Sequence, residues 1–162
     1  MKTAIVYYSM CGNTEFIADK IRKKLGDVDL IEITPVKTYP SKGIRKFLWG
    51  GKSAIMSEKP KLNPYTFSAE NYEQVIIGFP VWASRIAPPL RTFVEDNKEA
   101  LKDKTVSAYA CQAGNGAEKA FAGLKNLLGI ADYKATTILI DPKEKPSEDN
   151  EKAVAAFCEK LK

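Results

Sequence analysis

Histidine is absent from the 162 residues of this chain. It is the commonest general base and the commonest transition-metal ligand in proteins. Its absence excludes hydrolysis by a Ser-His-Asp triad, and it leaves no partner for cysteine in a zinc site or a Cys-His catalytic pair. We therefore predict no metal site and no catalytic side chain, and we expect any chemistry to belong to a bound cofactor.

Cysteine is scarce and widely spaced. Cys11, Cys111 and Cys158 form no C-x-x-C pair, so we expect three thiols in a reducing compartment. Long apolar runs are also missing, since none approaches the roughly 20 residues that span a bilayer. The N-terminal run "TAIVYY" is too short for the core of a signal peptide. These absences predict a cytoplasmic protein with no membrane contact.

Acidic residues are nearly absent from one segment, residues 37–61, which contains Glu58 as its single acid. Its basic residues are Lys37, Lys42, Arg45, Lys46, Lys52, Lys59 and Lys61. The segment therefore accounts for the net charge of +5. No nucleic-acid motif accompanies it, so nucleic acid is not a predicted partner. The remaining readings are a solvated lysine-rich loop and a basic face for an anionic partner.

Length and composition predict a single domain over residues 1–162. Its apolar runs are short and rich in β-branched and aromatic residues, and they alternate with helix-like stretches. These runs are "TAIVYY", "VDLIEI", "QVIIGF", "TVSAYA" and "TTILI". Such alternation is typical of an α/β fold, and continuously apolar strands indicate helices on both faces of the sheet. We predict an open, doubly wound, five-stranded parallel sheet.

Helices are predicted in four places by apolar residues at helical spacing. They follow Thr14 as far as Gly26, run from Pro88 to Leu101 and from Ala117 to Leu128, and begin after Ser147. The segment from about 35 to 71 differs because it is longer than an ordinary crossover and contains four prolines. We read it as a basic insertion or extended crossover, with a helix interrupted at Gly50-Gly51.

The loop after the first apolar run has the composition of a phosphate-binding loop. It reads Ser9-Met10-Cys11-Gly12-Asn13-Thr14 and leads directly into a helix. Backbone N–H groups at a helix N-terminus, together with nearby hydroxyls, can converge on a phosphate. The alternative is an ordinary strand-to-helix connection with a good N-cap.

Two further loops follow the third and fourth apolar runs. The first, "GFPVWASRIAPP" over residues 78–89, contains Trp82, which either stacks on a planar ligand ring or packs on the edge of the sheet. The second, "ACQAGNGAE" over residues 110–118, is a weak match to a dinucleotide-binding loop, because Lys119 stands where the third glycine is needed. Ligands of doubly wound sheets bind beyond the carboxyl ends of the strands, where these loops meet.

The segment "AIVYYSMCGNTEFIADKI" resembles the N-terminus of flavodoxins, which has a strand, the pattern S/T-x-T-G-N-T and a helix. The segment "IIGFPVWASRIAPPLRTFVED" resembles their second flavin loop. The resemblance implies strand order 2-1-3-4-5 and one non-covalently bound FMN. The residues that it assigns to FMN are Ser9, Met10, Cys11, Gly12, Asn13 and Thr14 around the phosphate; Pro80, Val81, Trp82, Ala83, Ser84 and Arg85 beside the isoalloxazine; and Cys111, Gln112, Ala113, Gly114, Asn115 and Gly116 at the pyrimidine end.

The chain departs from the flavodoxin pattern in its first two loops and in its charge. Cys11 replaces a hydroxyl residue, which predicts looser binding of FMN. The loop around Trp82 has no glycine, and Arg85 is basic where the family usually has acidic surroundings. Because residues 37–61 are also basic, a redox partner protein with an acidic docking face becomes possible.

The resemblance implies a flavoprotein that functions in electron transport, carrying electrons between redox partners. The main alternative is an oxidoreductase on the same fold, which would pass electrons from NAD(P)H or to a quinone through FMN. Reduction of the bound flavin by NAD(P)H alone would distinguish the enzyme from the carrier. A third possibility is a non-redox phosphate-binding module, but the aspartate cluster of receiver domains is missing after the first strand.

Overall fold

The computed structural model describes residues 2–40, 52 and 58–162. The interrupted helix predicted within residues 35–71, together with Lys42, Arg45 and Lys46 of the basic segment, falls mainly outside these residues.

Five parallel strands form the sheet, and they correspond to the five predicted runs. They are β1 (Thr3–Tyr7), β2 (Val28–Glu32), β3 (Gln74–Trp82), β5 (Thr105–Gln112) and β6 (Thr136–Ile140). Their order is β2-β1-β3-β5-β6, which is 2-1-3-4-5 when the parallel strands alone are counted. The fold class and the strand order are therefore as predicted.

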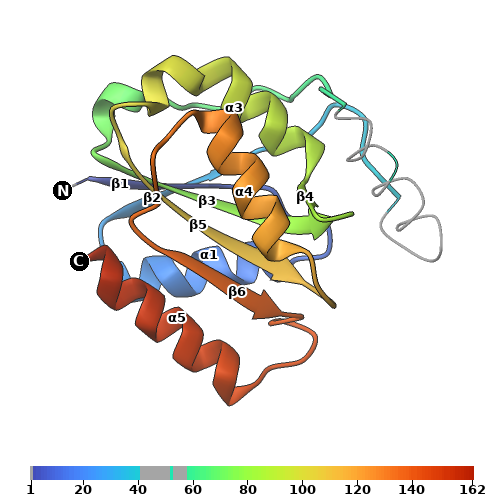
Figure 1. The fold of residues 1–162 in the computed structure, drawn as a ribbon, viewed down its shortest axis with the longest axis vertical. Coiled ribbons are helices and arrows are strands. Elements are labelled where there is room, and N and C mark those ends of the chain that lie inside the picture. Colours follow the sequence, from blue (N-terminus) through green and yellow to red (C-terminus); the bar gives the residue numbers. More distant parts are fainter. Residues whose placement is uncertain (1, 41–51, 53–57) are drawn as a thin grey trace.

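Helices cover both faces of the sheet (Figure 1). Helices α1 (Asn13–Leu25) and α5 (Glu148–Leu161) lie on one face, and α3 (Pro88–Leu101) and α4 (Ala117–Leu128) lie on the other. A short 3₁₀ turn, η1, spans Ala69–Asn71. The four predicted helices are confirmed, and Ser147 caps α5 as expected, since its Oγ accepts the N–H of Asn150 at 3.2 Å. Within the described ranges, no helix is both long and apolar enough to cross a membrane.

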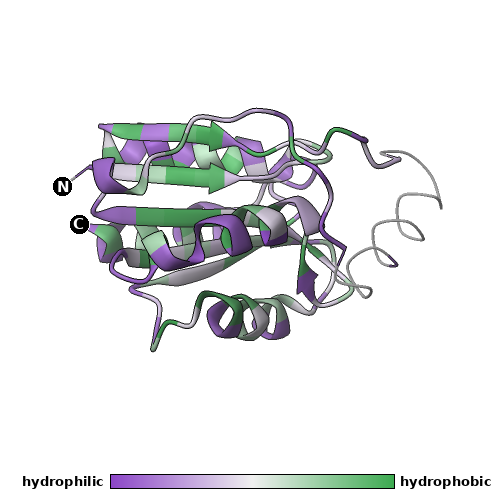
Figure 2. Ribbon diagram, turned by 90° about the horizontal axis from the view of Figure 1, so that it is seen from above, coloured by the Kyte–Doolittle hydropathy of each residue, from purple (hydrophilic) through white to green (hydrophobic). Residues whose placement is uncertain are grey.

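The core has two halves, one on each face of the sheet. Along β1, Ala4 and Val6 pack toward α3 and α4, whereas Ile5 and Tyr7 pack toward α1 and α5. The strands are coloured mainly as hydrophobic in Figure 2. Because successive side chains of a strand point to opposite faces, the apolar runs supply both halves at once. The strands end together at one edge of this core, on the side away from the two chain termini (Figure 1).

The structure corrects the prediction that residues 78–89 form a loop. Strand β3 continues to Trp82 and turns back through a short antiparallel strand, β4 (Arg85–Ile86). The two residues of the turn, Ala83 and Ser84, have φ of 48° and 60°. Two residues with positive φ match a type I′ hairpin turn, which usually contains Asn or Gly. Each non-glycine residue held there costs about 1–2 kcal/mol, so the surrounding contacts must fix this turn.

Candidate functional site

A cavity of about 260 Å³ opens at the carboxyl ends of β1, β3 and β5. Small-molecule sites usually measure about 300–1,000 Å³, so this cavity is slightly smaller than that range. Its walls come from the three loops predicted to hold a ligand and from the segment after β6. The lining residues are Ser9, Met10, Cys11, Asn13, Thr14, Pro80, Val81, Trp82, Ala83, Cys111, Gln112, Ala113, Asp141 and Glu144.

Most of the residues predicted for the site line this one cavity. The predicted residues that do not line it are Gly12, Ser84, Arg85, Gly114, Asn115 and Gly116. Gly12 and Gly116 shape the loops instead, since their φ values of 87° and 105° lie in the left-handed region. Ser84 and Arg85 line a second recess on the other side of the β3–β4 turn.

The first loop offers backbone donors at the start of α1. Ser9 Oγ accepts the N–H of Glu15 at 3.2 Å, and the carbonyl of Gly12 accepts the N–H of Phe16 at 3.0 Å. For the N–H groups of Asn13 and Thr14, residues 2–40, 52 and 58–162 provide no acceptor. A helix N-terminus with unsatisfied N–H groups favours an anion. Ser9 acts as a cap, yet the loop still has donors for a phosphate.

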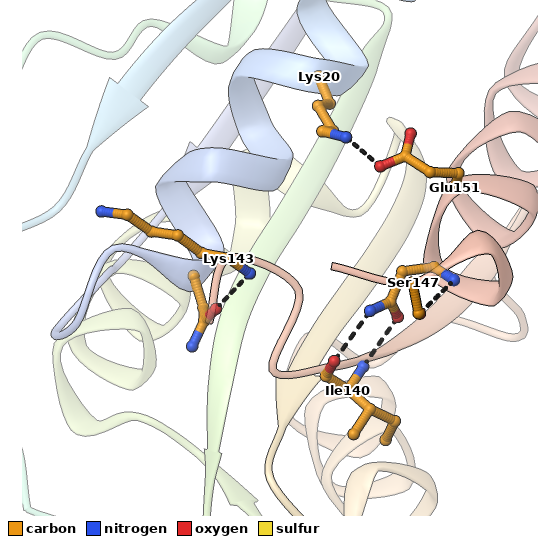
Figure 3. A network of polar contacts seen from close by, with 7 residues as sticks. Lys20, Ile140, Lys143, Ser147 and Glu151 are labelled. Atoms are coloured by element: carbon orange, nitrogen blue, oxygen red, sulfur yellow. Dashed lines mark hydrogen bonds and ion pairs between the residues drawn. The ribbon is translucent and has the colours of Figure 1, made fainter. Parts of the chain in front are cut away.

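The segment after β6 contacts this loop, although its residues were not among those predicted for the site. The N–H of Lys143 donates to Asn13 Oδ1 at 2.8 Å (Figure 3). A Cβ on Gly12 would lie 2.6 Å from Lys143 Nζ, so the lysine chain crosses the loop at its glycine. Lys143 therefore brings a positive charge beside the predicted phosphate position. The sequence could have indicated this contact, because the segment follows the fifth strand and the carboxyl ends of parallel strands share an edge.

Two acidic residues of the same segment line the cavity. Asp141 is 7% exposed, has a φ of 39°, and forms an ion pair with Lys145 at 2.9 Å. Glu144 also lines the cavity. The paired Asp141 contributes little net charge, so Glu144 and Lys143 leave this wall nearly neutral.

Trp82 both packs against neighbouring side chains and lines the cavity. Its side chain is 8% exposed and meets Tyr8 and Tyr39 edge-on, with ring centroids 5.7 and 5.1 Å apart. It also lines the cavity between Val81 and Ala83. The indole is thus held in place by aromatic neighbours at the cavity wall. Stacking of its ring on a cofactor remains a prediction.

Cys111 is a buried thiol on the wall formed by β5. Burial raises its pKa to about 12, whereas a hydrogen bond with Thr14 lowers it to a smaller extent. A thiol with this pKa is neutral at pH 7 and is a poor nucleophile. The side chain therefore serves as a small apolar part of the wall.

A family model described as Flavodoxin matches residues 2–154, which is nearly the whole chain. This chain belongs to the flavodoxin family. The resemblance seen in the first loop is therefore confirmed, and the predicted cofactor, FMN, is the one that flavodoxins bind.

Solved structures share the fold of this flavodoxin. A flavoprotein from Lactobacillus acidophilus in complex with FMN is 24% identical, with a TM-score of 0.73, covering 88% of this chain and 95% of that one. A putative flavoprotein from Bacteroides eggerthii is 24% identical, with a TM-score of 0.76 and coverage of 98% and 96%. The two-electron reduced flavodoxin of Megasphaera elsdenii is 20% identical, with a TM-score of 0.58 and coverage of 98% and 94%. No curated protein matches the chain.

Proposed function

We propose that this flavodoxin binds FMN without a covalent bond and carries electrons between redox partner proteins. The observation that carries the proposal is that Asn13 and Thr14 line the cavity and that residues 2–40, 52 and 58–162 provide no acceptor for their N–H groups. They suit a phosphate rather than a neutral group, because the start of α1 has a partial positive charge. The related flavoprotein that contains FMN supports the same assignment.

The residues of the cavity fit FMN at both of its ends. The phosphate would be held by the start of α1, with the hydroxyl of Ser9 and the amine of Lys143 nearby. The ring would lie between Trp82 and the wall that contains Cys111. FMN supplies the redox chemistry when bound, since it can accept and release electrons.

The protein itself would bind, orient and shield the cofactor. The buried Trp82 and Cys111 exclude water from one side of the cavity, which strengthens electrostatic interactions inside it. Cys111 remains protonated at neutral pH and exchanges no proton with the ligand. No side chain is required to act as a general acid or base. The proposal includes a partner with an acidic docking face, since the basic residues of the chain are concentrated in residues 37–61.

Titration of the protein with FMN and with riboflavin, followed by flavin fluorescence, is the first test. FMN is expected to bind at least about tenfold more tightly, because one charge-assisted hydrogen bond alone contributes about 1.5–3 kcal/mol. Stepwise anaerobic reduction of the complex should then pass through two one-electron steps in the visible spectrum. Equal affinity for both flavins would contradict the phosphate assignment. Rapid reduction by NAD(P)H alone would contradict the carrier and favour the oxidoreductase.

FMN is also expected to protect Cys11 from alkylation. Cys11 is partly exposed and lines the cavity, whereas Cys158, a residue of α5, is buried and does not line it. At an FMN concentration ten times the Kd, labelling of Cys11 by iodoacetamide should slow by about tenfold, as mass action requires. Mass spectrometry of the labelled peptides gives both rates, with Cys158 as the internal control. Unchanged labelling of Cys11 at saturating FMN would place the ligand elsewhere.

A further inference from the structure

A second, smaller recess lies on the opposite side of the β3–β4 turn from the cofactor cavity. Its volume is about 70 Å³, and it lies between β4, the start of α3 and one side of α4. Its floor is apolar, with Ile86, Leu124 and Leu127. The recess is the right size for one small polar group rather than for a whole cofactor.

Cations dominate the rim of this recess. Arg85, Arg91 and Lys119 line it from β4, α3 and α4, against the single acid Glu58. Glu95 partly neutralises Arg91, since it pairs with Arg91 Nε at 3.0 Å and also with Lys59.

Arg85 and Lys119 are exposed, and within residues 2–40, 52 and 58–162 neither of them has an ion pair or a side-chain hydrogen bond. Because these two cations outnumber the one acid among the lining residues, Glu58, the recess favours an anionic occupant.

The recess and the cofactor cavity share one wall. Ala83 lines the cavity, whereas its neighbours Ser84 and Arg85 line the recess. The turn is held against α4, because a Cβ on Gly116 would come within 2.6 Å of Ser84 Oγ. An anion bound in the recess would therefore be separated from the cofactor only by this hairpin turn.

We infer that the recess is the docking point for a carboxylate side chain on the acidic face of a redox partner protein. The inference rests on the proposed electron-carrier function and adds the place of the contact and the residues that make it. Charge complementarity favours an acidic partner, and the shared hairpin places that partner next to the cofactor. The carboxylate would hold the two proteins together while one electron leaves the reduced cofactor, which is oxidised, and enters the partner, which is reduced.

The test measures how fast the reduced, FMN-loaded protein gives one electron to ferricyanide, a trianion that becomes ferrocyanide. The rate should fall as ionic strength rises, and Lys119→Glu should lower it by about tenfold at low salt, as expected when steering is lost. With hexaammineruthenium(III), a trication, the same variant should be faster than the wild type. FMN affinity should not change in Lys119→Glu, since Lys119 lines only the recess.

Lys125→Glu is the matched control, because it makes the same charge change on the same helix. Lys125 pairs with Asp132 and does not line the recess. If Lys125→Glu and Lys119→Glu slow ferricyanide equally, only the net charge matters and the inference is overturned. The inference would also be overturned if Lys119→Glu changed neither the rate with ferricyanide nor the rate with hexaammineruthenium(III).

A second arm of the test needs no cofactor. Titration of the protein with hexaglutamate should produce saturable amide shifts at Ala120, Gly123 and Leu127, which line the recess, and Lys119→Glu should weaken binding by about fivefold. Shifts elsewhere, or none, would overturn the inference. So would saturation by inorganic phosphate at equal ionic strength without any response to hexaglutamate. If FMN itself fails to bind, the proposed function is wrong. The titration with hexaglutamate still shows whether the recess binds carboxylates.

Discussion

Asn13→Asp is expected to weaken the binding of FMN by at least about tenfold and to leave the affinity for riboflavin unchanged. The substitution is nearly isosteric, and Asp keeps the oxygen that accepts the N–H of Lys143. It adds a negative charge beside the position proposed for the phosphate. At about 4 Å, two like charges repel by about 1–4 kcal/mol, depending on the effective dielectric constant. Riboflavin lacks the phosphate and would not meet this repulsion.

The stability of the variant without ligand should move in the opposite direction. A carboxylate in the first turn of a helix interacts favourably with the partial positive charge there, typically by about 0.3–1 kcal/mol. Urea denaturation of the apo protein should therefore show Asn13→Asp to be as stable as the wild type or slightly more stable. Loss of FMN affinity without loss of stability separates a phosphate effect from a folding defect.

Asn126→Asp provides the matched control for this experiment. Asn126 is exposed on α4 and does not line the cavity, so the same change in net charge should alter FMN affinity by less than about twofold at physiological ionic strength. If Asn13→Asp binds FMN as the wild type does, the phosphate does not lie at the start of α1. In that case the alternative, an ordinary strand-to-helix connection, would be the correct interpretation of this loop.

The parallel strands and the helices could be predicted because each has strong local signals. The strand runs are continuously apolar, and Gly26, Pro88, Gly129 and Ser147 mark helix ends by their backbone and capping preferences. The β3–β4 hairpin could not be predicted. Its turn has Ala83 and Ser84 at positive φ, and neither residue is typical of a type I′ turn. Tertiary contacts, such as the close approach of Gly116 to Ser84, hold a conformation that the local sequence disfavours.

The candidate site also has features that could be predicted from the sequence and features that could not. Its three loops could be located in advance, because the carboxyl ends of parallel strands always share an edge. The role of Asn13 could not, since its amide oxygen binds Lys143, which is 130 residues away along the chain. The setting of Trp82 also depends on distant residues, because Tyr39 comes from the segment after β2. Spacing along the sequence identifies the site, whereas the partners of its side chains follow only from the folded structure.

Gly78→Ala is expected to lower the free energy of unfolding by about 2–5 kcal/mol, combining the usual cost of an overpacked core with that of a disrupted buried hydrogen bond. Gly78 lies on β3, and a Cβ there would overlap the phenol ring of Tyr109 on β5. Tyr109 is fully buried, and its hydroxyl donates to the carbonyl of Thr14 at 2.9 Å. The ring cannot yield to the new methyl group without breaking this bond. Urea denaturation measures the loss, and FMN affinity should fall with it, because Thr14 lies in the first turn of α1.

Two further variants separate the causes of this effect. Tyr109→Phe removes only the hydroxyl, so it should cost about 0.5–1.5 kcal/mol through the loss of its hydrogen bond to the carbonyl of Thr14. Gly123→Ala makes the same chemical change as Gly78→Ala, but a Cβ there would meet nothing within 4 Å. Because Gly123 is inside a helix, alanine should raise stability by about 0.5–1 kcal/mol. Opposite signs for the two glycine substitutions would assign the loss at Gly78 to the tyrosine ring. A small effect at both positions would mean that the ring moves freely and that Tyr109 does not hold the start of α1 in place.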